Sequence, residues 1–157
     1  MSNTNLQSGR RSRHTPKVGD VFKMQLPDKS YLFGRVILAD SDGPTPGSIL
    51  VYIYEDRAEE VAADPTALSP ARLLIPPVFT HRALWNKGYF ETVANHALKE
   101  TDLIEQHCFW DVMRSKYVDE HGQPLPGRVD PCGVFALASL NLIDTEISDA
   151  LGIPRAD

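Results

Sequence analysis

The sequence predicts an α+β domain that is mostly β, built on a twisted antiparallel sheet with one or two short helices. Apolar and polar residues alternate with a period of two near the N-terminus, which is typical of strands with one buried face. Clusters of Pro, Gly, Asp and Ser separate the apolar runs and predict turns. The chain has 157 residues, of which 42% are hydrophobic and 24% charged, and this is typical of one globular domain.

Residues 1–16 are rich in Ser, Asn and Arg and contain one large apolar residue, Leu6. A segment of this kind buries too little surface to offset the entropy that it loses on ordering. We therefore expect a flexible basic tail over residues 1–16 and a single domain over residues 17–157.

Residues 20–39 predict a β-hairpin. The turn falls at residues 27–30, because proline presets φ there and an aspartate side chain can bond to the nearby backbone. A strand that alternates in this way turns one set of side chains inward. The residues expected to face the core are Phe22, Met24 and Leu26.

Gly34 interrupts the second strand of this hairpin and indicates a bulge or the close approach of another backbone. Residues 40–47 form a loop by composition, and residues 49–54 predict a third strand that is apolar on both faces. Ser69 followed by Pro70 predicts the start of a short helix, with a capping hydroxyl and a proline at the first helical position.

A second hairpin is predicted from residues 78–85 and 89–97, which flank a short turn that ends in a glycine. Residues 108–118 predict a further strand, and residues 132–140 are compatible with either a strand or a helix. Near the end, Asp144 or Thr145 is expected to cap a helix that runs to Leu151 and ends at the following glycine.

The charge distribution restricts the possible partners. The chain carries 16 basic and 21 acidic residues, a net charge of −5. Four of the bases and none of the acids lie in residues 1–17, so the rest of the chain has 12 bases against 21 acids, or −9. An acidic body of this kind disfavours broad binding to nucleic acids or anionic membranes and favours a basic partner.

No set of residues predicts catalysis, a metal site or a cofactor. The five histidines lack zinc-ligand spacing, and the nucleophile-elbow, dinucleotide-binding and Walker patterns are absent. Cys108 and Cys132 are too few for a disulfide scaffold and favour two reduced thiols. The longest apolar run, residues 49–54, is too short to cross a membrane, and no secretory signal is recognisable, so we expect a cytoplasmic protein.

The acids that flank the third strand are candidates for a partner-binding face. They fall in two exposed stretches, expected at opposite ends of that strand, and would attract a basic partner. Nearby aromatic residues, with Tyr54 and Trp85 as candidates, would supply the anchors that carry most of the affinity. The acids are Asp40, Asp42, Glu55, Asp56, Glu59 and Glu60.

The N-terminal hairpin resembles the opening of the immunity protein 26 family, the antitoxins of bacterial polymorphic toxin systems that include contact-dependent inhibition. The resemblance covers about twenty residues, 17–36, and a weaker similarity continues through residues 84–90, where tryptophan is expected at or next to Tyr89 and is absent. The matching residues are Gly19, Asp20, Phe22, Asp28, Phe33, Gly34, Arg35 and Val36.

The resemblance implies a protein that is not an enzyme and that binds a toxin made by the same cell or its kin. The implied partner is the C-terminal domain of the cognate toxin, and a basic nuclease would suit an acidic inhibitor. The inhibitor would block the active site or the path of the substrate. An inhibitor of this kind needs nanomolar affinity, about −12 kcal/mol.

Arg35 lies in an otherwise apolar strand, and a buried guanidinium needs a partner. We expect a structural role first and a contact with the toxin second, with Asp20 on the preceding strand as its partner. Two other functions stay open. The first is a small SH3-like module that binds nucleic acid through the basic tail, and the second is an enzyme that uses Cys108 or His107.

Overall fold

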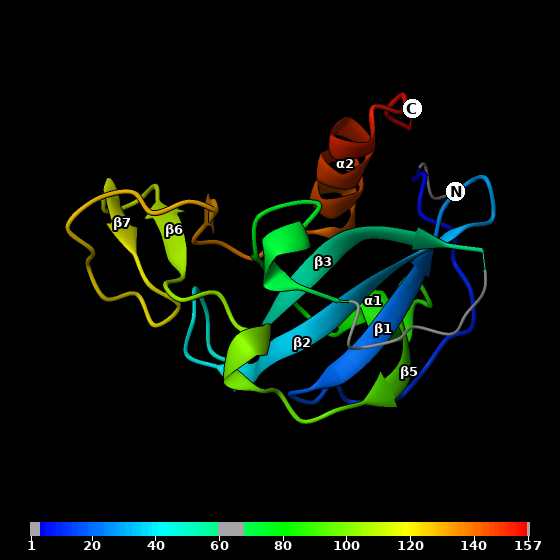
Figure 1. Cartoon of the computed structure of the whole chain (residues 1–157), viewed down its shortest axis with the longest axis horizontal. Helices are drawn as coiled ribbons and strands as arrows, with labels where there is room; N and C mark the ends of the chain where they lie inside the picture. The colour runs from blue at the N-terminus through cyan, green and yellow to red at the C-terminus, as the bar shows by residue number, and fades with distance from the viewer. Residues whose placement is uncertain (1–3, 60–67, 157) are drawn as a thin grey trace.

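The computed structural model describes residues 4–59 and 68–156. A five-stranded antiparallel sheet in the order β4-β3-β2-β1-β5 forms the body, and a smaller sheet in the order β7-β6-β8 projects from one end (Figure 1). The fold is therefore α+β and mostly β, as predicted. The strands are β1 (Asp20–Gln25), β2 (Tyr31–Ser41), β3 (Ser48–Ala58), β4 (Val78–Thr80), β5 (Glu91–Asn95), β6 (Cys108–Asp111), β7 (Lys116–Val118) and β8 (Cys132–Val134). The helices are η2 (Pro70–Arg72), α1 (Ala83–Asn86), η3 (Glu100–Asp102) and α2 (Leu140–Leu151).

The larger sheet is buried on both faces. Successive side chains of a strand point to opposite faces, so alternate residues of β1, β2 and β3 enter two separate cores. In β2, for example, Leu32 and Val36 belong to the core that contains residues of α1 and α2, whereas Phe33 and Ile37 belong to the core shared with the smaller sheet. Residues of α1 and α2 thus pack against one face of the larger sheet, and residues of β6 and β7 pack against the other face.

The predicted N-terminal hairpin is confirmed, with β1 and β2 paired in antiparallel register. Its three predicted core residues are all buried. Gly34 marks a close approach, because a Cβ there would collide with the ring of Phe22 and lie 2.7 Å from the carbonyl oxygen of Tyr52. The ladder between β2 and β3 also shifts its register beside Gly34, which is the predicted bulge.

The predicted second hairpin is wrong. Residues 78–80 form β4 at one edge of the sheet and residues 91–95 form β5 at the other edge, so they do not pair. Between them lies the short helix α1, which buries Leu84 and Trp85. Short apolar runs do not distinguish a strand from a single buried helical turn, because both place apolar side chains inside.

Residues 108–118 form two strands, β6 and β7, and not one. The turn between them is closed by Asp111, whose carboxylate accepts hydrogen bonds from the backbone N–H and the guanidinium of Arg114. Ser115 adopts a positive φ of 53° in this turn.

Helix α2 begins one turn earlier than predicted. Ser139 caps it by accepting a hydrogen bond from Leu142 N, and Gly152 ends it in the predicted left-handed conformation. Asp144, one of the two predicted caps, lies inside the helix, and its carboxylate accepts hydrogen bonds from the backbone N–H groups of Asn5 and Leu6. The contacts of a distant segment thus decide the role of this carboxylate.

The described part of the predicted flexible tail, residues 4–16, lies against the domain. Leu6 is buried in the core next to the helices, and Gln7 pairs with Gln25 at the end of β1. Composition predicted a tail because a single apolar residue contributes little burial. In the structure, the pairing of Gln7 with Gln25 and the hydrogen bonds that Asp144 accepts from Asn5 N and Leu6 N also hold the segment against the domain.

No helix among the described residues is long and apolar enough to cross a membrane, and α2, with 12 residues, is the longest of them.

Candidate partner-binding surface

The predicted acidic residues lie at opposite ends of β3, as expected. Asp40 lies near the end of β2, Asp42 directly follows that strand, and both are exposed. Glu55 and Asp56 extend the other end of β3, which runs further than predicted, and Glu59 follows it. The sixth acid, Glu60, lies outside the described residues.

The two ends of β3 differ in how strongly their charges are neutralised. At one end, Arg72 of η2 forms ion pairs with Glu55 at 3.1 Å and with Asp56 at 2.7 Å. At the other end, Asp42 Oδ1 lies 2.9 Å from Nδ1 of His121, while Asp40 has no ion pair among the residues described. Glu55 and Asp56 therefore share one guanidinium group, whereas Asp40 has no basic partner among the described residues.

Tyr54 and Trp85 are wrong as exposed anchors, because both are fully buried. Trp85 lies edge-on against the rings of Phe22 and Phe90, in the core next to the helices. Tyr54 lies in the other core, where burial raises the pKa of its hydroxyl. Neither side chain can contact a partner in this structure.

Arg35 is also buried, and its partner is not Asp20. Its guanidinium forms an ion pair with Asp102 and donates hydrogen bonds to the carbonyl oxygens of Gly19 and His96. The carboxylate of Asp20 has other partners: it accepts from Asn95 Nδ2 at 2.8 Å and from Lys17 N, and it lies 2.7 Å from Nε2 of His14. Arg35 therefore links β2 to η3 and the end of β5, which is a structural role.

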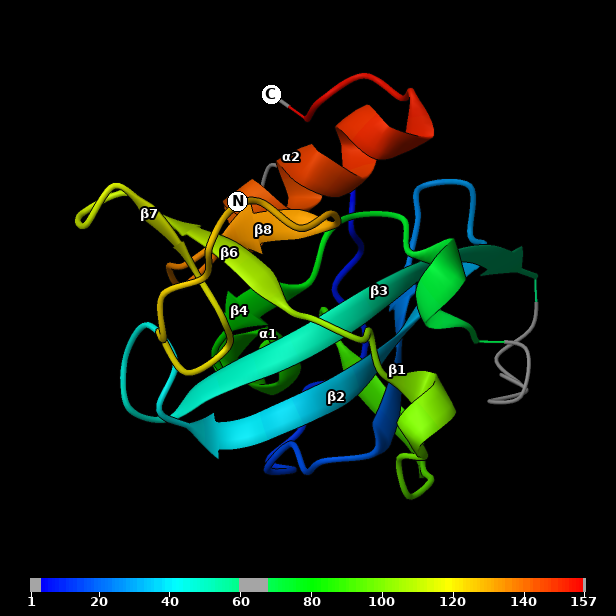
Figure 2. The ribbon, with the colours of Figure 1, turned by 60° about the vertical axis from the view of Figure 1, so that its left-hand side comes forward.

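Among the large apolar side chains of residues 4–59 and 68–156, the most exposed belong to the turn between β6 and β7. Met113 is 93% exposed and Val112 is 65% exposed. The turn projects from the molecule (Figure 2) and is held by the Asp111–Arg114 ion pair at 2.6 Å. Exposed apolar residues on a turn that is already held in place can enter a partner's pocket with little further loss of backbone conformational entropy.

This turn lies close to Asp42. Arg114 Nη2 donates a hydrogen bond to the carbonyl oxygen of Gly122, and the neighbouring His121 pairs with Asp42. Because His121 donates this bond, the pKa of Asp42 is lowered and the pKa of His121 is raised. We call the resulting patch the hairpin surface. It comprises Asp40, Asp42, Val112, Met113, Arg114 and His121.

Sequence reasoning missed this surface because residues 108–118 were predicted as one continuous strand. The signal is the sequence Asp-Val-Met-Arg-Ser-Lys at positions 111–116. An aspartate that can bond to the backbone two or three residues later is typical of turns. Recognising it would have placed Val112 and Met113 at an exposed tip.

A chain of hydrogen bonds links the two sheets. The Tyr52 hydroxyl lies 2.6 Å from Nε2 of His107, and His107 Nδ1 lies 2.5 Å from a Glu120 oxygen. Ile104 N donates to the same hydroxyl, so the hydroxyl proton is left for Nε2, and Nδ1–H then donates to Glu120. Burial raises the pKa of Tyr52 to about 12, and the bond from His107 lowers the pKa of Glu120. All three side chains have partners, which fits a structural connection between β3 and the small sheet.

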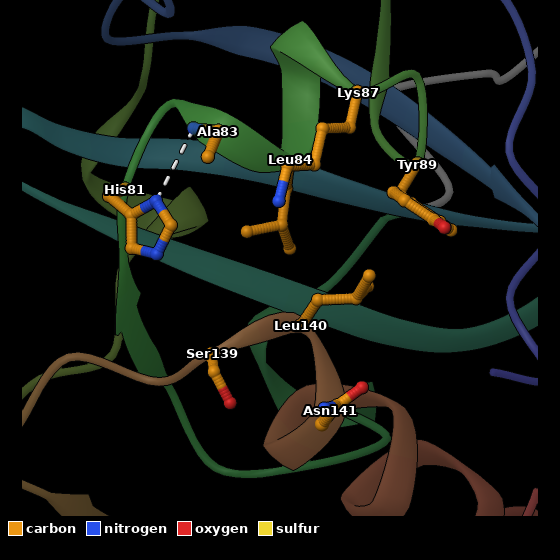
Figure 3. A pocket seen from close by; sticks show the side chains of 8 residues that line it. All are labelled: His81, Ala83, Leu84, Lys87, Tyr89, Ser139, Leu140 and Asn141. Atoms are coloured by element: carbon orange, nitrogen blue, oxygen red, sulfur yellow. Dashed lines mark hydrogen bonds between the residues drawn. The ribbon is translucent and has the colours of Figure 1, made fainter. Parts of the chain in front are cut away.

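A cleft of about 290 Å³ separates α1 from the start of α2 (Figure 3). His81 lies at its edge, where Nδ1 accepts a long hydrogen bond of 3.4 Å from Ala83 N. The only hydroxyl on the α2 side, Ser139, accepts the capping bond of that helix. Leu84 and Leu140 face each other across the cleft, so its walls are partly apolar.

The described residues contain no group of three or more His, Cys, Asp or Glu side chains able to hold a metal ion. Cys108 on β6 lies beside Cys132 on β8, and their sulfur atoms are 3.4 Å apart. Both are free thiols, with no disulfide bond between them. Burial raises the pKa of the Cys132 thiol to about 11, which disfavours the reactive thiolate.

Comparison with known proteins identifies a family for this chain. The family model described as Immunity protein 26 matches residues 17–119. The matched segment contains all five strands of the larger sheet and the β6–β7 hairpin. No curated protein and no solved structure shows significant similarity to the chain.

Proposed function

Because the chain belongs to the immunity protein 26 family, we propose that it binds one cognate bacterial toxin domain and neutralises it by covering its active site. The family match over residues 17–119 is the observation that carries this proposal. The proposed role is stoichiometric inhibition and not catalysis. The partner is the C-terminal domain of a toxin, and a basic nuclease is the toxin that an acidic inhibitor suits best.

The hairpin surface is the contact region that we propose. Protein interfaces concentrate affinity in a few anchors that become fully buried, surrounded by a polar rim. Met113 and Val112 are suited to the first role and Asp40 and Asp42 to the second. Glu55, Asp56 and Glu59, at the far end of β3, and Glu60 would contribute a more distant attraction that acts mainly on the association rate.

Co-expression tests the proposal. Each reading frame that neighbours the gene is expressed from an inducible promoter, with and without this protein, to identify a toxic product, and growth is followed. We expect the protein to restore growth and the purified pair to form a complex of equal stoichiometry. Toxicity that persists at full expression of a folded protein would overturn the proposal.

The same experiment includes a control for specificity. A toxin domain of a different family, expressed at the same level, should stay toxic in the presence of the protein. Rescue from both toxins would indicate a general stress response and would contradict cognate inhibition.

A further inference from the structure

The basic segment at residues 10–13 has a fixed course over the domain. On one side, Gly9 N donates to the carbonyl oxygen of Gly88 at 2.8 Å. The two backbones approach so closely that a Cβ at Gly88 would lie 2.6 Å from the carbonyl oxygen of Gly9. On the other side, His14 and Lys17 N both bond to the carboxylate of Asp20. The segment is therefore held at both ends, and its arginines are displayed at a defined place.

The arginines of the protein divide into two groups. Six of the ten form an ion pair with a carboxylate, as Arg35 and Arg72 do. The other four have no carboxylate partner among the described residues, and all four are exposed. These four are Arg10, Arg11, Arg13 and Arg82, and we call them the arginine surface.

The four unpaired arginines lie together. Arg11, Arg13 and Arg82 line an open hollow of about 580 Å³, and Arg10, Arg11 and Arg13 line a second one of about 370 Å³. The one acid that lines either hollow, Glu91, is within 3.6 Å of Lys23 Nζ. A net positive surface thus stands on a protein whose overall charge is −5.

This placement indicates an anionic partner. Guanidinium groups bind carboxylates and phosphates through paired hydrogen bonds, and here they are free of competing carboxylates. Figure 1 shows the N-terminal segment beside β5, at the end of the molecule opposite the β6–β7 hairpin. A group bound at the arginine surface would therefore contact a different part of the partner from the hairpin surface.

The chemistry favours carboxylates over nucleic acid. Single-stranded nucleic acids bind through aromatic side chains on which the bases stack, together with basic residues. The aromatic residues nearest in sequence to Arg82 are Phe79, Trp85 and Tyr89, and all three are buried. Backbone binding alone needs many phosphate contacts, and the arginine surface offers four basic side chains.

We propose that the arginine surface is a second docking surface, which binds a segment of the toxin protein rich in Asp and Glu. This proposal rests on the proposed function and adds to it a second contact of opposite charge. The inhibitor would thereby require a partner that is basic at one place and acidic at another, which increases its specificity for one toxin over others.

The test compares two triple variants with the same change in net charge. The first, Arg11→Gln/Arg13→Gln/Arg82→Gln, neutralises the arginine surface. The control, Lys29→Gln/Lys99→Gln/Lys116→Gln, neutralises three exposed lysines elsewhere. Surface plasmon resonance measures binding to the cognate toxin protein and to a twelve-residue peptide of alternating Asp and Glu, at 50 and 300 mM salt, and circular dichroism checks folding.

We expect the arginine variant to bind both ligands at least tenfold more weakly at low salt and to lose most of the salt dependence of peptide binding, while the control stays within twofold of wild type. Equal loss in both variants, or no loss in the arginine variant, would overturn the proposal. Tighter binding of a twelve-nucleotide single-stranded DNA than of the peptide would assign the surface to nucleic acid and also overturn it. Failure of the wild-type protein to protect cells would instead overturn the proposed function, which these binding ratios do not test.

Discussion

Arg35 Nη1 lies 3.2 Å from Oδ2 of Asp102, and this ion pair connects the centre of the larger sheet to η3, 67 positions later in the chain. Arg35 is 1% exposed, so its charge depends on this carboxylate and on the carbonyl oxygens of Gly19 and His96. The pair explains how an arginine is tolerated in an otherwise apolar strand.

Replacing Asp102 tests this relationship. Asp102→Asn should lower the free energy of unfolding by roughly 3–5 kcal/mol, because Arg35 then keeps a buried charge without a counter-ion. Asparagine can still accept the hydrogen bond from Lys99 N, so the end of η3 is preserved. Urea unfolding of a double-mutant cycle with Arg35→Met should give a coupling of about 1–3 kcal/mol. The cycle between Asp20→Asn and Arg35→Met is the control, and coupling there instead of at Asp102 would contradict the assignment.

The aromatic cluster beneath the hairpin should dominate stability. Phe22 is fully buried, stacks on Phe90 with ring centroids 4.5 Å apart and lies edge-on against Trp85. Phe22→Ala should therefore cost roughly 3–5 kcal/mol in thermal or urea unfolding. Met113→Ala is the matched control and should change stability by less than about 0.5 kcal/mol, because Met113 is exposed. A loss below about 1 kcal/mol for Phe22→Ala would contradict the observed burial.

The N-terminal segment should contribute to stability. Leu6 is buried against the helix-side core, so Leu6→Ala should cost roughly 2–5 kcal/mol, the range for large core side chains. Leu142→Ala, at an exposed site of α2, should be nearly neutral. Equal melting temperatures for the Leu6 variant and the wild type would support the prediction that residues 1–16 form a flexible tail.

Glu120 predicts a pH dependence. The bond donated by His107 holds its pKa below the 4.5 of an unperturbed glutamate, so the folded state favours the charged carboxylate. The stability that this bond supplies is complete above that value and is lost as the pH falls through the lower pKa of the folded protein. Urea unfolding between pH 3 and 7 should therefore show a shallower acid-side decline for Glu120→Gln than for the wild type. Glu105→Gln, the same substitution at an exposed site, should follow the wild type. Parallel curves of stability against pH for all three proteins would show that Glu120 does not contribute to the loss of stability at acid pH.

The acids should act on toxin binding unequally. At low salt, Asp40→Asn/Asp42→Asn should slow association several-fold and flatten its salt dependence, because charged rims act mainly on the association rate. Glu55→Gln/Asp56→Asn changes the charge equally and should act less, because Arg72 already pairs with both residues. Met113→Ala should instead speed dissociation, by roughly tenfold or more if Met113 is an anchor.

Surface plasmon resonance against the toxin domain separates these effects. Neutralising Asp40, Asp42, Glu55, Asp56, Glu59 and Glu60 together should slow association most. A sextuple variant that associates as fast as wild type at low salt would exclude electrostatic attraction by these acids. The hairpin surface would be excluded as the contact region if Met113→Ala bound with unchanged dissociation.

The sequence alone determined the features that depend on local chemistry. Alternation around Phe22 identified the side chains of β1 that enter the core next to the helices, the Pro27–Ser30 turn closed the hairpin, and Gly152 ended α2. The same twenty residues carried the resemblance to the immunity protein 26 family that the family match bears out. Each of these signals lies within a few residues of the structure that it specifies, and here local preference and tertiary packing agree.

The tertiary structure decided everything that depends on partners far away in the chain. Arg35 could pair with any carboxylate that folding brings near, and only the packing of η3 selected Asp102 over Asp20. The sequence of Leu84 and Trp85 is compatible with either a strand or a helix. In the structure they lie in α1, which connects β4 and β5 at opposite edges of the sheet. The acids, the arginines and Met113 are all visible in the sequence. Burial and ion pairing decide which of these side chains are available to a partner, and burial and ion pairing depend on the folded structure.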